Sequence, residues 1–247
     1  MEKTQGRDIL HYEIARIYLI ERKPSVTKKD LAFKRAFDII FSFLIIVCIL
    51  SWLLPILALL IKLNSRGPVL FIQSRTGCLG KKFKCIKLRT MYLNEEANIT
   101  QASSDDPRIT SIGKFLRFSC MDELPQFFNV LIGDMSIVGP RPHMISDCFE
   151  FSKIIRDYNH RNSVKPGITG MAQVKGYRGK TNNFYDIVHR YKWDMFYIRN
   201  LSFNLDMRIL NLTMSSTFKA IFASIFRVED EVIEAPSYSL EASEYLN

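Results

Sequence analysis

The stretch IIFSFLIIVCILSWLLPILALLI, residues 39–61, contains twenty-three consecutive residues without a charge. A straight helix of this length, rising about 1.5 Å per residue, would cross the hydrocarbon layer of a bilayer, which is roughly 30 Å thick. Pro55 lies inside the stretch, and it kinks or breaks a helix because it lacks a backbone donor and clashes with the preceding turn. The stretch has basic flanks, which favour the cytoplasmic side of a membrane, at Lys28, Lys29, Lys34, Arg35, Lys62 and Arg66. The sequence therefore predicts a bent, re-entrant helix that enters and leaves through one leaflet, with a single-pass anchor as the alternative.

The charge of the chain is unevenly distributed. The net charge is +9, but the residues after Arg227 include six carboxylates and no Lys or Arg, so residues 1–227 carry +15. Residues 62–94 contain eight Lys or Arg and no carboxylate. Directly after a membrane element, such a run predicts attraction to anionic lipid headgroups or to a phosphorylated ligand. Nucleic acid is excluded as a partner, because no helix-turn-helix, zinc-finger or RNA-stacking motif accompanies the basic run.

The cysteines and histidines do not form a metal or disulfide pattern. The five cysteines are odd in number and none are spaced as C-x-x-C, which argues against a disulfide framework or a zinc site. The four histidines have no metal-site spacing. We interpret them as surface or packing residues.

The rest of the chain has an α+β pattern with more helix than strand. Residues 69–75 and 83–91 are predicted to be two strands joined by a glycine-containing turn. Apolar spacing and capping residues predict helices over 8–22, 111–119, 122–133, 184–199 and 205–226. The last of these helices could pack on the core or lie in a membrane interface, and its few charges favour the interface.

The stretch RFSCMDELPQFFNVLIGDMSIVGPRPH, residues 117–143, holds the side chains best suited to chemistry. Asp122 and Glu123 come just before a proline, which favours the first turn of a helix, where the helix dipole stabilises an anion. An ionised carboxylate can attack phosphorus, although an acidic residue at this place can equally be a helix cap. Arg117 and Arg141 lie nearby in the sequence, and arginine matches phosphate oxygens with two donors. Together with the basic strands, these residues predict phosphoryl transfer to or from a lipid.

Several longer motifs, in order, resemble those of the bacterial sugar transferases, the monotopic polyprenyl-phosphate phosphoglycosyl transferases. They are KRAFDIIFSFL, FKCIKLRTM, DPRITSIGKFLR, MDELPQFFNVLIGDMSIVGPRP, VKPGITGMAQVKG and LSFNLDMRILNLT, and the resemblance covers about residues 32–215. Taken together with the apolar spacing before Pro24 and the acidic run at the end of the chain, it predicts four parts: an N-terminal amphipathic extension (1–30), a re-entrant membrane helix hairpin (31–64), a cytoplasmic catalytic domain (65–226) and an acidic, flexible tail (227–247). It also implies a helix-rich α+β domain with a small β-hairpin, placed at the bacterial inner membrane.

The resemblance further implies transfer of a sugar 1-phosphate from a UDP-sugar to undecaprenyl phosphate, with Mg²⁺ and release of UMP. By position, Asp122 would be the nucleophile that becomes an aspartyl phosphosugar, and Glu123 the residue that binds the metal. Arg117, Arg141, Lys87 and Arg89 would contact phosphate, and Pro55 would break the membrane helix. Small members carry a serine directly before this proline; here Leu54 takes that place and Ser51 lies further back. The run from Tyr177 to Asp206 resembles the larger glucose- or galactose-type enzymes and favours a hexose donor.

Two other functions are compatible with the same features. One is a hydrolase that cleaves nucleotide- or lipid-linked pyrophosphates with water as acceptor. The other is a non-catalytic scaffold at anionic membranes that recruits a polysaccharide assembly complex. Downstream glycosyltransferases and a second copy of the chain, as a homodimer, are candidate protein partners.

Overall fold

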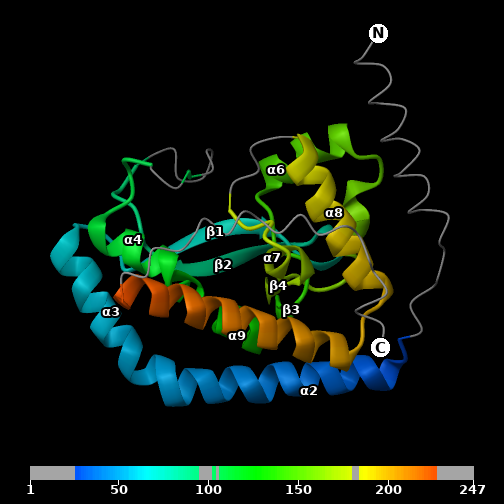
Figure 1. Cartoon of the computed structure of the whole chain (residues 1–247), viewed down its shortest axis with the longest axis horizontal. Coiled ribbons are helices and arrows are strands. Elements are labelled where there is room, and N and C mark those ends of the chain that lie inside the picture. Colours follow the sequence, from blue (N-terminus) through cyan, green and yellow to red (C-terminus); the bar gives the residue numbers. More distant parts are fainter. Residues whose placement is uncertain (1–25, 95–101, 104–105, 180–183, 227–247) are drawn as a thin grey trace, which may run out of the picture.

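The computed structural model describes residues 26–94, 102–103, 106–179 and 184–226. A long bent helix runs along one side of a domain in which helices surround two small sheets (Figure 1). The predicted α+β class is confirmed. The predicted helix over 8–22 and the acidic tail over 227–247 lie outside the described residues.

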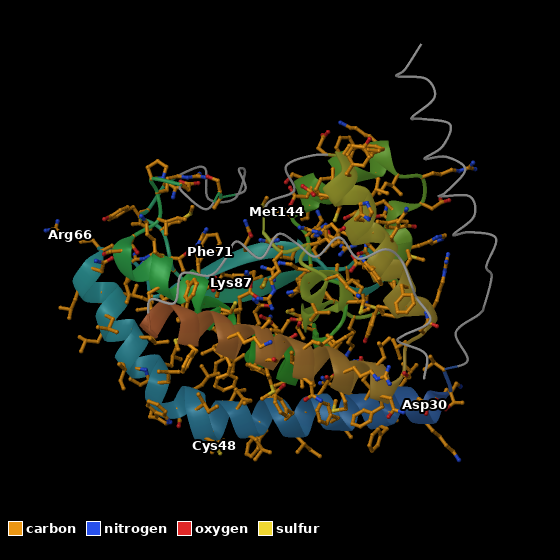
Figure 2. The ribbon with its side chains drawn as sticks, viewed as in Figure 1. Asp30, Cys48, Arg66, Phe71, Lys87 and Met144 are labelled. Carbon is orange, nitrogen blue, oxygen red and sulfur yellow. The ribbon has the colours of Figure 1, made fainter. Side chains whose placement is uncertain are left out.

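The apolar stretch forms one continuous helix that bends. α2 (Lys28–Ile45), the π-helical turn η1 (Ile46–Leu50) and α3 (Ser51–Asn64) follow one another without a non-helical residue. The two arms point in different directions, with Cys48 near the bend (Figures 1 and 2). The geometry is therefore that of a bent helix rather than of two helices separated by a loop.

The bend is accompanied by replacement hydrogen bonds. Pro55 lies inside α3 and cannot donate to the carbonyl one turn before it. In the π-helical turn, the N–H of Ser51 donates to the carbonyl of Ile46, five residues back. The Ser51 hydroxyl donates to the carbonyl of Val47 at 2.6 Å. The Ser51 hydroxyl thus supports the bend one turn before the proline by giving the Val47 carbonyl a partner. In an apolar segment, backbone groups must find such partners within the protein.

The outer surface of the bent helix is apolar. Large exposed side chains lie along both arms, at Leu31, Phe33, Ile39, Ile40, Phe43, Leu44, Val47, Ile49, Trp52, Ile56, Leu59, Leu60 and Leu63. A continuous apolar surface of this extent marks contact with a membrane or a partner. By length and hydropathy, Lys28–Asn64 is the one candidate membrane span among the described residues.

The first arm is fixed to the domain by polar groups. The buried carboxylate of Asp38 accepts hydrogen bonds from the Ser136 hydroxyl at 3.1 Å and from the N–H of Ile137 at 3.0 Å. Lys34 Nζ lies 2.5 Å from the carboxylate of Asp206 on the last helix. These polar contacts give the apolar helix one rotational setting on the domain, because the alternative settings would leave buried polar groups without partners.

The second arm is fixed by apolar packing and by an arginine. Leu57 and Ile61 pack against Leu88 and Leu116. Arg89 donates to the carbonyl of Ser65, which ends α3, at 2.7 Å, and to the next carbonyl at 2.6 Å. Both ends of the bent helix therefore contact one domain.

The predicted pair of strands forms an antiparallel hairpin. β1 (Leu70–Thr76) pairs with β2 (Lys82–Leu88) in the register Leu70 with Leu88 and Thr76 with Lys82. The short turn η2 (Cys78–Gly80) joins them. Phe83, Cys85 and Leu88 of β2 are buried, whereas Lys82 and Lys84 are exposed.

A second, parallel pair of strands was not predicted. β3 (Ser136–Val138) pairs with β4 (Gly167–Thr169). The backbones approach so closely that a Cβ on Gly139 would lie 2.4 Å from the carbonyl of Lys165, and one on Gly167 would lie 2.1 Å from the nitrogen of Gly139. The glycines in VGPRP and PGITG are therefore required by this contact, which places the loop after β3.

The remaining helices complete the domain. They are α4 (Ser111–Phe118), α5 (Gln126–Ile132), α6 (Ile145–Ile154), α7 (Met171–Val174), α8 (Phe184–Arg199) and α9 (Phe203–Phe226), with single turns η4 (Met121–Glu123) and η5 (Tyr158–Ser163). The sequence predicted the positions of α4, α8 and α9 and missed α6 and α7. Leu205 and Ile209 bury the start of α9 in the core, whereas Met214 and Phe218 are exposed. The start of α9 thus packs on the core, and an interfacial position for its second half stays a prediction.

Asp38→Ala should destabilise the protein. The substitution leaves the Ile137 N–H and the Ser136 hydroxyl buried without an acceptor, which costs about 1–3 kcal/mol. Asp38→Asn retains an acceptor oxygen and should cost less. Thermal unfolding of the detergent-solubilised chain measures both; equal losses for the two variants would contradict the role assigned to these hydrogen bonds.

Candidate active site

A tight turn carries the two adjacent carboxylates. Cys120 has a left-handed backbone (φ 56°), which is uncommon for a residue with a Cβ atom. The 3₁₀ turn η4 follows and contains Asp122 and Glu123, and α5 begins only at Gln126. The predicted helix over 122–133 is therefore a 3₁₀ turn followed by a shorter helix, with Gly133 as the predicted C-terminal cap. No side-chain hydrogen bond caps η4 or α5, so the carboxylates do not act as helix caps.

Helix α5 fixes this turn against the hairpin. The Asn129 side chain accepts from the N–H of Ile86 at 3.0 Å and donates to the carbonyl of Lys84 at 2.8 Å, so α5 is bound to β2. Arg35 of α2 donates to the carbonyls of Val130 and Leu131 near the other end of α5. The turn that carries the carboxylates is thereby held between the hairpin and α2.

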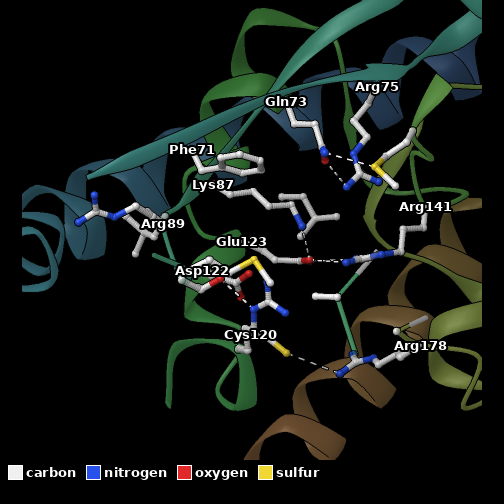
Figure 3. Close-up of a pocket in the computed structure, with 18 of the residues that line it drawn as sticks. Phe71, Gln73, Arg75, Lys87, Arg89, Cys120, Asp122, Glu123, Arg141 and Arg178 are labelled. Atoms are coloured by element: carbon white, nitrogen blue, oxygen red, sulfur yellow. Dashed lines mark hydrogen bonds and ion pairs between the residues drawn. The ribbon is translucent and has the colours of Figure 1, made fainter. Parts of the chain in front are cut away.

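Glu123 is the centre of an ion-pair cluster. Lys87 Nζ lies 2.8 Å from its Oε1, and the two terminal nitrogens of Arg141 lie 2.5 and 3.1 Å from its two oxygens (Figure 3). Burial alone would raise the pKa of Glu123, but the charges of Arg141 and Lys87 outweigh it and hold the pKa well below its usual range. Glu123 therefore stays ionised and joins β2, η4 and the loop after β3.

Asp122 differs from its neighbour. It is half-buried, lies beside the ionised Glu123, and makes no ion pair with the described residues. Burial and then the Glu123 charge raise the pKa of Asp122 to about 6, although Lys87, Arg141 and Arg117 lower it. The two adjacent carboxylates thus have separate roles available, one as a fixed anion and one as a group that gains or loses its proton near neutral pH.

Arg117 lies where the prediction placed it. It is in the last turn of α4, and its Nε donates to the Thr90 hydroxyl at 2.8 Å. Its charge acts on Asp122. Its terminal nitrogens have no hydrogen bond to the described residues, so they are available to a ligand.

Arg89 has another function in this structure. Its side chain points away from Glu123 (Figure 3), and its terminal nitrogens bind the carbonyls of residues 65 and 66. A Cβ on Gly67 would lie 2.0 Å from one of these nitrogens, so the glycine makes room for the arginine. Arg89 lies along the wall of the pocket, but its donors hold the end of α3; a contact with phosphate would require those bonds to break.

The carboxylates face a cavity of about 620 Å³. Three cationic residues that the sequence analysis did not single out also line it: Arg75, Arg178 and Arg190. Among the described lining residues, seven Lys or Arg face three carboxylates, so the cavity favours an anionic ligand. These arginines lie on β1, after α7 and on α8, and no local motif in the sequence connects them to Asp122.

The carboxylate oxygens at the site suit a divalent metal whose other ligands come mainly from a bound substrate and water. No group of three or more His, Cys, Asp or Glu that could hold a metal occurs among the described residues. Mg²⁺ needs only one or two carboxylates when substrate phosphates and waters complete its shell. Asp122 and Glu123 can supply these oxygens, although both oxygens of Glu123 already accept from Lys87 or Arg141.

Fold and site together define a protein with a long, bent apolar helix and a cavity whose mostly cationic lining suits an anionic ligand. The family model described as bacterial sugar transferase matches residues 29–220. The chain belongs to the bacterial sugar transferase family.

The chain is also similar to individual members. It is 46% identical over 190 residues to a UDP-glucose:undecaprenyl-phosphate glucose-1-phosphate transferase of Klebsiella pneumoniae, covering 76% of this chain and 41% of that protein. It is 44% identical over 192 residues to the exopolysaccharide production protein PSS of Rhizobium leguminosarum bv. phaseoli, covering 76% and 96%. It is 42% identical over 183 residues to a UDP-N-acetylgalactosamine-undecaprenyl-phosphate N-acetylgalactosaminephosphotransferase of Aeromonas hydrophila, covering 73% and 42%. The chain thus spans about two fifths of the length of the first and last of these relatives.

Asp122→Asn should stabilise the protein at neutral pH. The native Asp122 keeps its proton up to about pH 6, whereas an unfolded aspartate loses it near 3.8, so its contribution to stability falls as the pH rises between these values. The variant should therefore unfold at a higher temperature than the wild type at pH 7.5, and the difference should shrink at pH 5. A variant that is less stable at pH 7.5 would show that the surrounding cations stabilise the Asp122 anion instead.

Proposed function

We propose that this chain transfers a sugar 1-phosphate from a UDP-sugar to undecaprenyl phosphate, giving undecaprenyl-diphospho-sugar and UMP. The observation that carries the proposal is the pair of adjacent carboxylates in a cavity rich in arginine. Asp122 has a raised pKa, and Glu123 is an anion held in ion pairs. Relatives named for glucose-phosphate and N-acetylgalactosamine-phosphate transfer to undecaprenyl phosphate support this substrate class. A hexose donor is favoured, and initiation of a polysaccharide or glycoconjugate is the expected role.

In the first step, a carboxylate oxygen of Asp122 attacks the phosphorus attached to the sugar. The new oxygen–phosphorus bond forms as the bond to the UMP oxygen breaks, and that oxygen takes the electron pair. Arg117 and Arg141, with Lys87, lie around the carboxylates and can stabilise the charge on the transferring group. In the second step, an oxygen of undecaprenyl phosphate attacks the same phosphorus and releases the Asp122 carboxylate. The acceptor is therefore the lipid phosphate.

Mg²⁺ is part of the proposal. Glu123, with Asp122, would hold it together with phosphate oxygens of the substrate. When bound, it supplies positive charge that neutralises those oxygens. Glu123 keeps its ionised form through Arg141 and Lys87, so these two residues keep an anion ready at the site.

The bent helix is proposed to lie in the inner membrane in re-entrant form, with the domain on the cytoplasmic face. Both arms contact one domain, and the apolar side chains point away from it (Figure 2). A straight span would separate these two contacts by a bilayer. The arrangement brings a lipid phosphate and a soluble nucleotide sugar to one cavity, which is a positioning effect. An anionic membrane, downstream glycosyltransferases and a homodimer stay predicted partners.

Asp122→Asn should abolish UMP release, because the amide cannot form the phosphosugar ester. Incubation of the wild type with donor alone, followed by proteolysis and mass spectrometry, should reveal a hexose phosphate on the peptide that contains Asp122. Arg117→Ala should retain this adduct and raise the KM for the donor. Labelled lipid product formed without any modification of Asp122 would overturn the covalent route.

Two rival functions give different results in the same assay. A hydrolase would release free sugar phosphate from labelled UDP-sugar rather than an organic-extractable lipid product. A scaffold would retain its function in cells when Asp122 and Glu123 are both replaced by alanine. The transferase requires a lipid-linked product and loss of the glycan in that double variant.

The membrane topology can be tested by cysteine labelling. Asp30→Cys and Asn64→Cys introduce exposed thiols near the two ends of the bent helix. In the re-entrant form, a membrane-impermeant maleimide should label both only after the inner membrane has been opened, with the parent chain as control for the native cysteines. Labelling of one of the two in intact spheroplasts would indicate a single-pass anchor.

A further inference from the structure

The turn at residues 141–143 collects guanidinium groups from distant elements. Arg75 of β1 donates to the carbonyl of Pro142 at 3.0 Å. Arg190 of α8 has a terminal nitrogen 3.5 Å from Nε2 of His143. Both arginines line the cavity that contains the paired carboxylates. They therefore belong to the same cavity as Asp122, at a different place along its wall.

The charges of Arg75 and Arg190 are not neutralised by an ion pair with any described carboxylate. Arg75 donates otherwise to the amide oxygen of Gln73 at 2.5 Å, and Arg190 to the carbonyl of Gly179 at 3.1 Å, both neutral acceptors. The Nε atoms of both arginines are buried without a partner in the described part of the chain. By contrast, the nearby Arg161 is paired with a buried aspartate. Arg190 is buried and Arg75 half-buried. Carboxylates act on both only through space, Asp147 and Glu123 on Arg75 and Asp194 on Arg190, so a bound anion would give each arginine a direct ion-pair partner.

His143 orients one of these arginines. Its pKa is lowered well below the ordinary value by burial and by the surrounding arginines, so the ring is neutral. Because Arg190 can only donate, Nε2 of His143 must be the acceptor, and Nδ1 then donates to the Tyr158 hydroxyl at 2.7 Å. His143 is thus a positioning residue for Arg190.

The location of Arg75 matches the leaving side of the proposed reaction. Figure 3 shows Arg75 and Asp122 on opposite sides of the ion pair between Glu123 and Arg141. In phosphoryl transfer, the nucleophile and the leaving oxygen lie on opposite sides of the phosphorus. α6 and the start of α8 also lie on the side of the domain away from α2 (Figure 1), which favours a soluble ligand over the lipid.

We propose that Arg75 and Arg190, with His143 as the positioning residue, form a second anion subsite that binds the nucleotide phosphate that leaves as UMP. The assignment rests on the proposed function. As the bond between the two phosphates breaks, the leaving oxygen takes the electron pair, and the UMP phosphate gains negative charge. Two arginines that make no ion pair with a described carboxylate would stabilise this developing charge more than the ground state, which is how such groups accelerate a reaction.

The test compares UMP with uridine on purified full-length protein. For the wild type, Arg75→Gln and Arg190→Gln, the UMP-induced rise in unfolding temperature and the inhibition constant of UMP are measured, alongside the KM of undecaprenyl phosphate. Each substitution should weaken UMP binding about tenfold, because a charge-assisted hydrogen bond is lost. Uridine binding and the KM of the lipid should change little, since neither would use this subsite.

Arg156→Gln is the matched control, because this side chain is 94% exposed and does not line the cavity. Arg190→Lys keeps the charge and should bind UMP better than Arg190→Gln, which separates loss of charge from loss of packing. Unchanged UMP affinity in folded Arg75 and Arg190 variants would overturn the proposal, and so would a raised lipid KM with unchanged UMP affinity. UMP binding can be measured without turnover. A wild-type protein that transfers no sugar phosphate would therefore refute the transferase function, and its UMP affinity would still test the subsite.

Discussion

The ion-pair cluster at Glu123 is the interaction on which the site depends. Lys87 from β2 and Arg141 from the loop after β3 meet on one carboxylate, so three segments distant in sequence are fixed relative to one another. The same cluster sets the chemistry of Asp122. Its neighbour remains an anion because two cations hold it, and that anion helps to raise the pKa of Asp122. One carboxylate therefore builds the site and the other remains available for reaction.

The bent apolar helix and the site are held together by direct polar contacts. Asp38 ties α2 to the backbone of β3, whose following loop carries Arg141, and Arg35 binds the end of α5, whose preceding turn carries Asp122. Arg89 ties the end of α3 to the strand that also carries Lys87. The distance of the carboxylates from the bent helix is thus set by polar contacts rather than by the apolar surface, which has no directional preference.

Elements whose sequence signal lies in neighbouring residues were predicted correctly. The hairpin, α4, α8 and α9 follow from apolar spacing and turn residues, and the apolar stretch with Pro55 predicted a bent helix. The motif around Asp122 and Glu123 was recognised, and Lys87, Arg117 and Arg141 do gather around it. The parallel pairing of β3 with β4 was missed, because three-residue strands carry no periodic signal. The resemblance assigned Arg89 to phosphate, yet β2 ends at Leu88 and the terminal nitrogens of Arg89 donate to the carbonyls at the end of α3.

The apolar helix, the order of the main elements, the adjacent carboxylates and the basic character of the chain all follow from neighbouring residues, so they can be predicted without the fold. Only the tertiary structure decided which cations face the carboxylates. Arg75, Arg178 and Arg190 reach the cavity from separate elements. Arg89 lines the wall of the cavity, but contacts with residues far from it in the chain occupy its donors at the end of α3. The different protonation behaviour of Asp122 and Glu123 has the same origin, because it arises from burial and from charges that folding brings within a few ångströms.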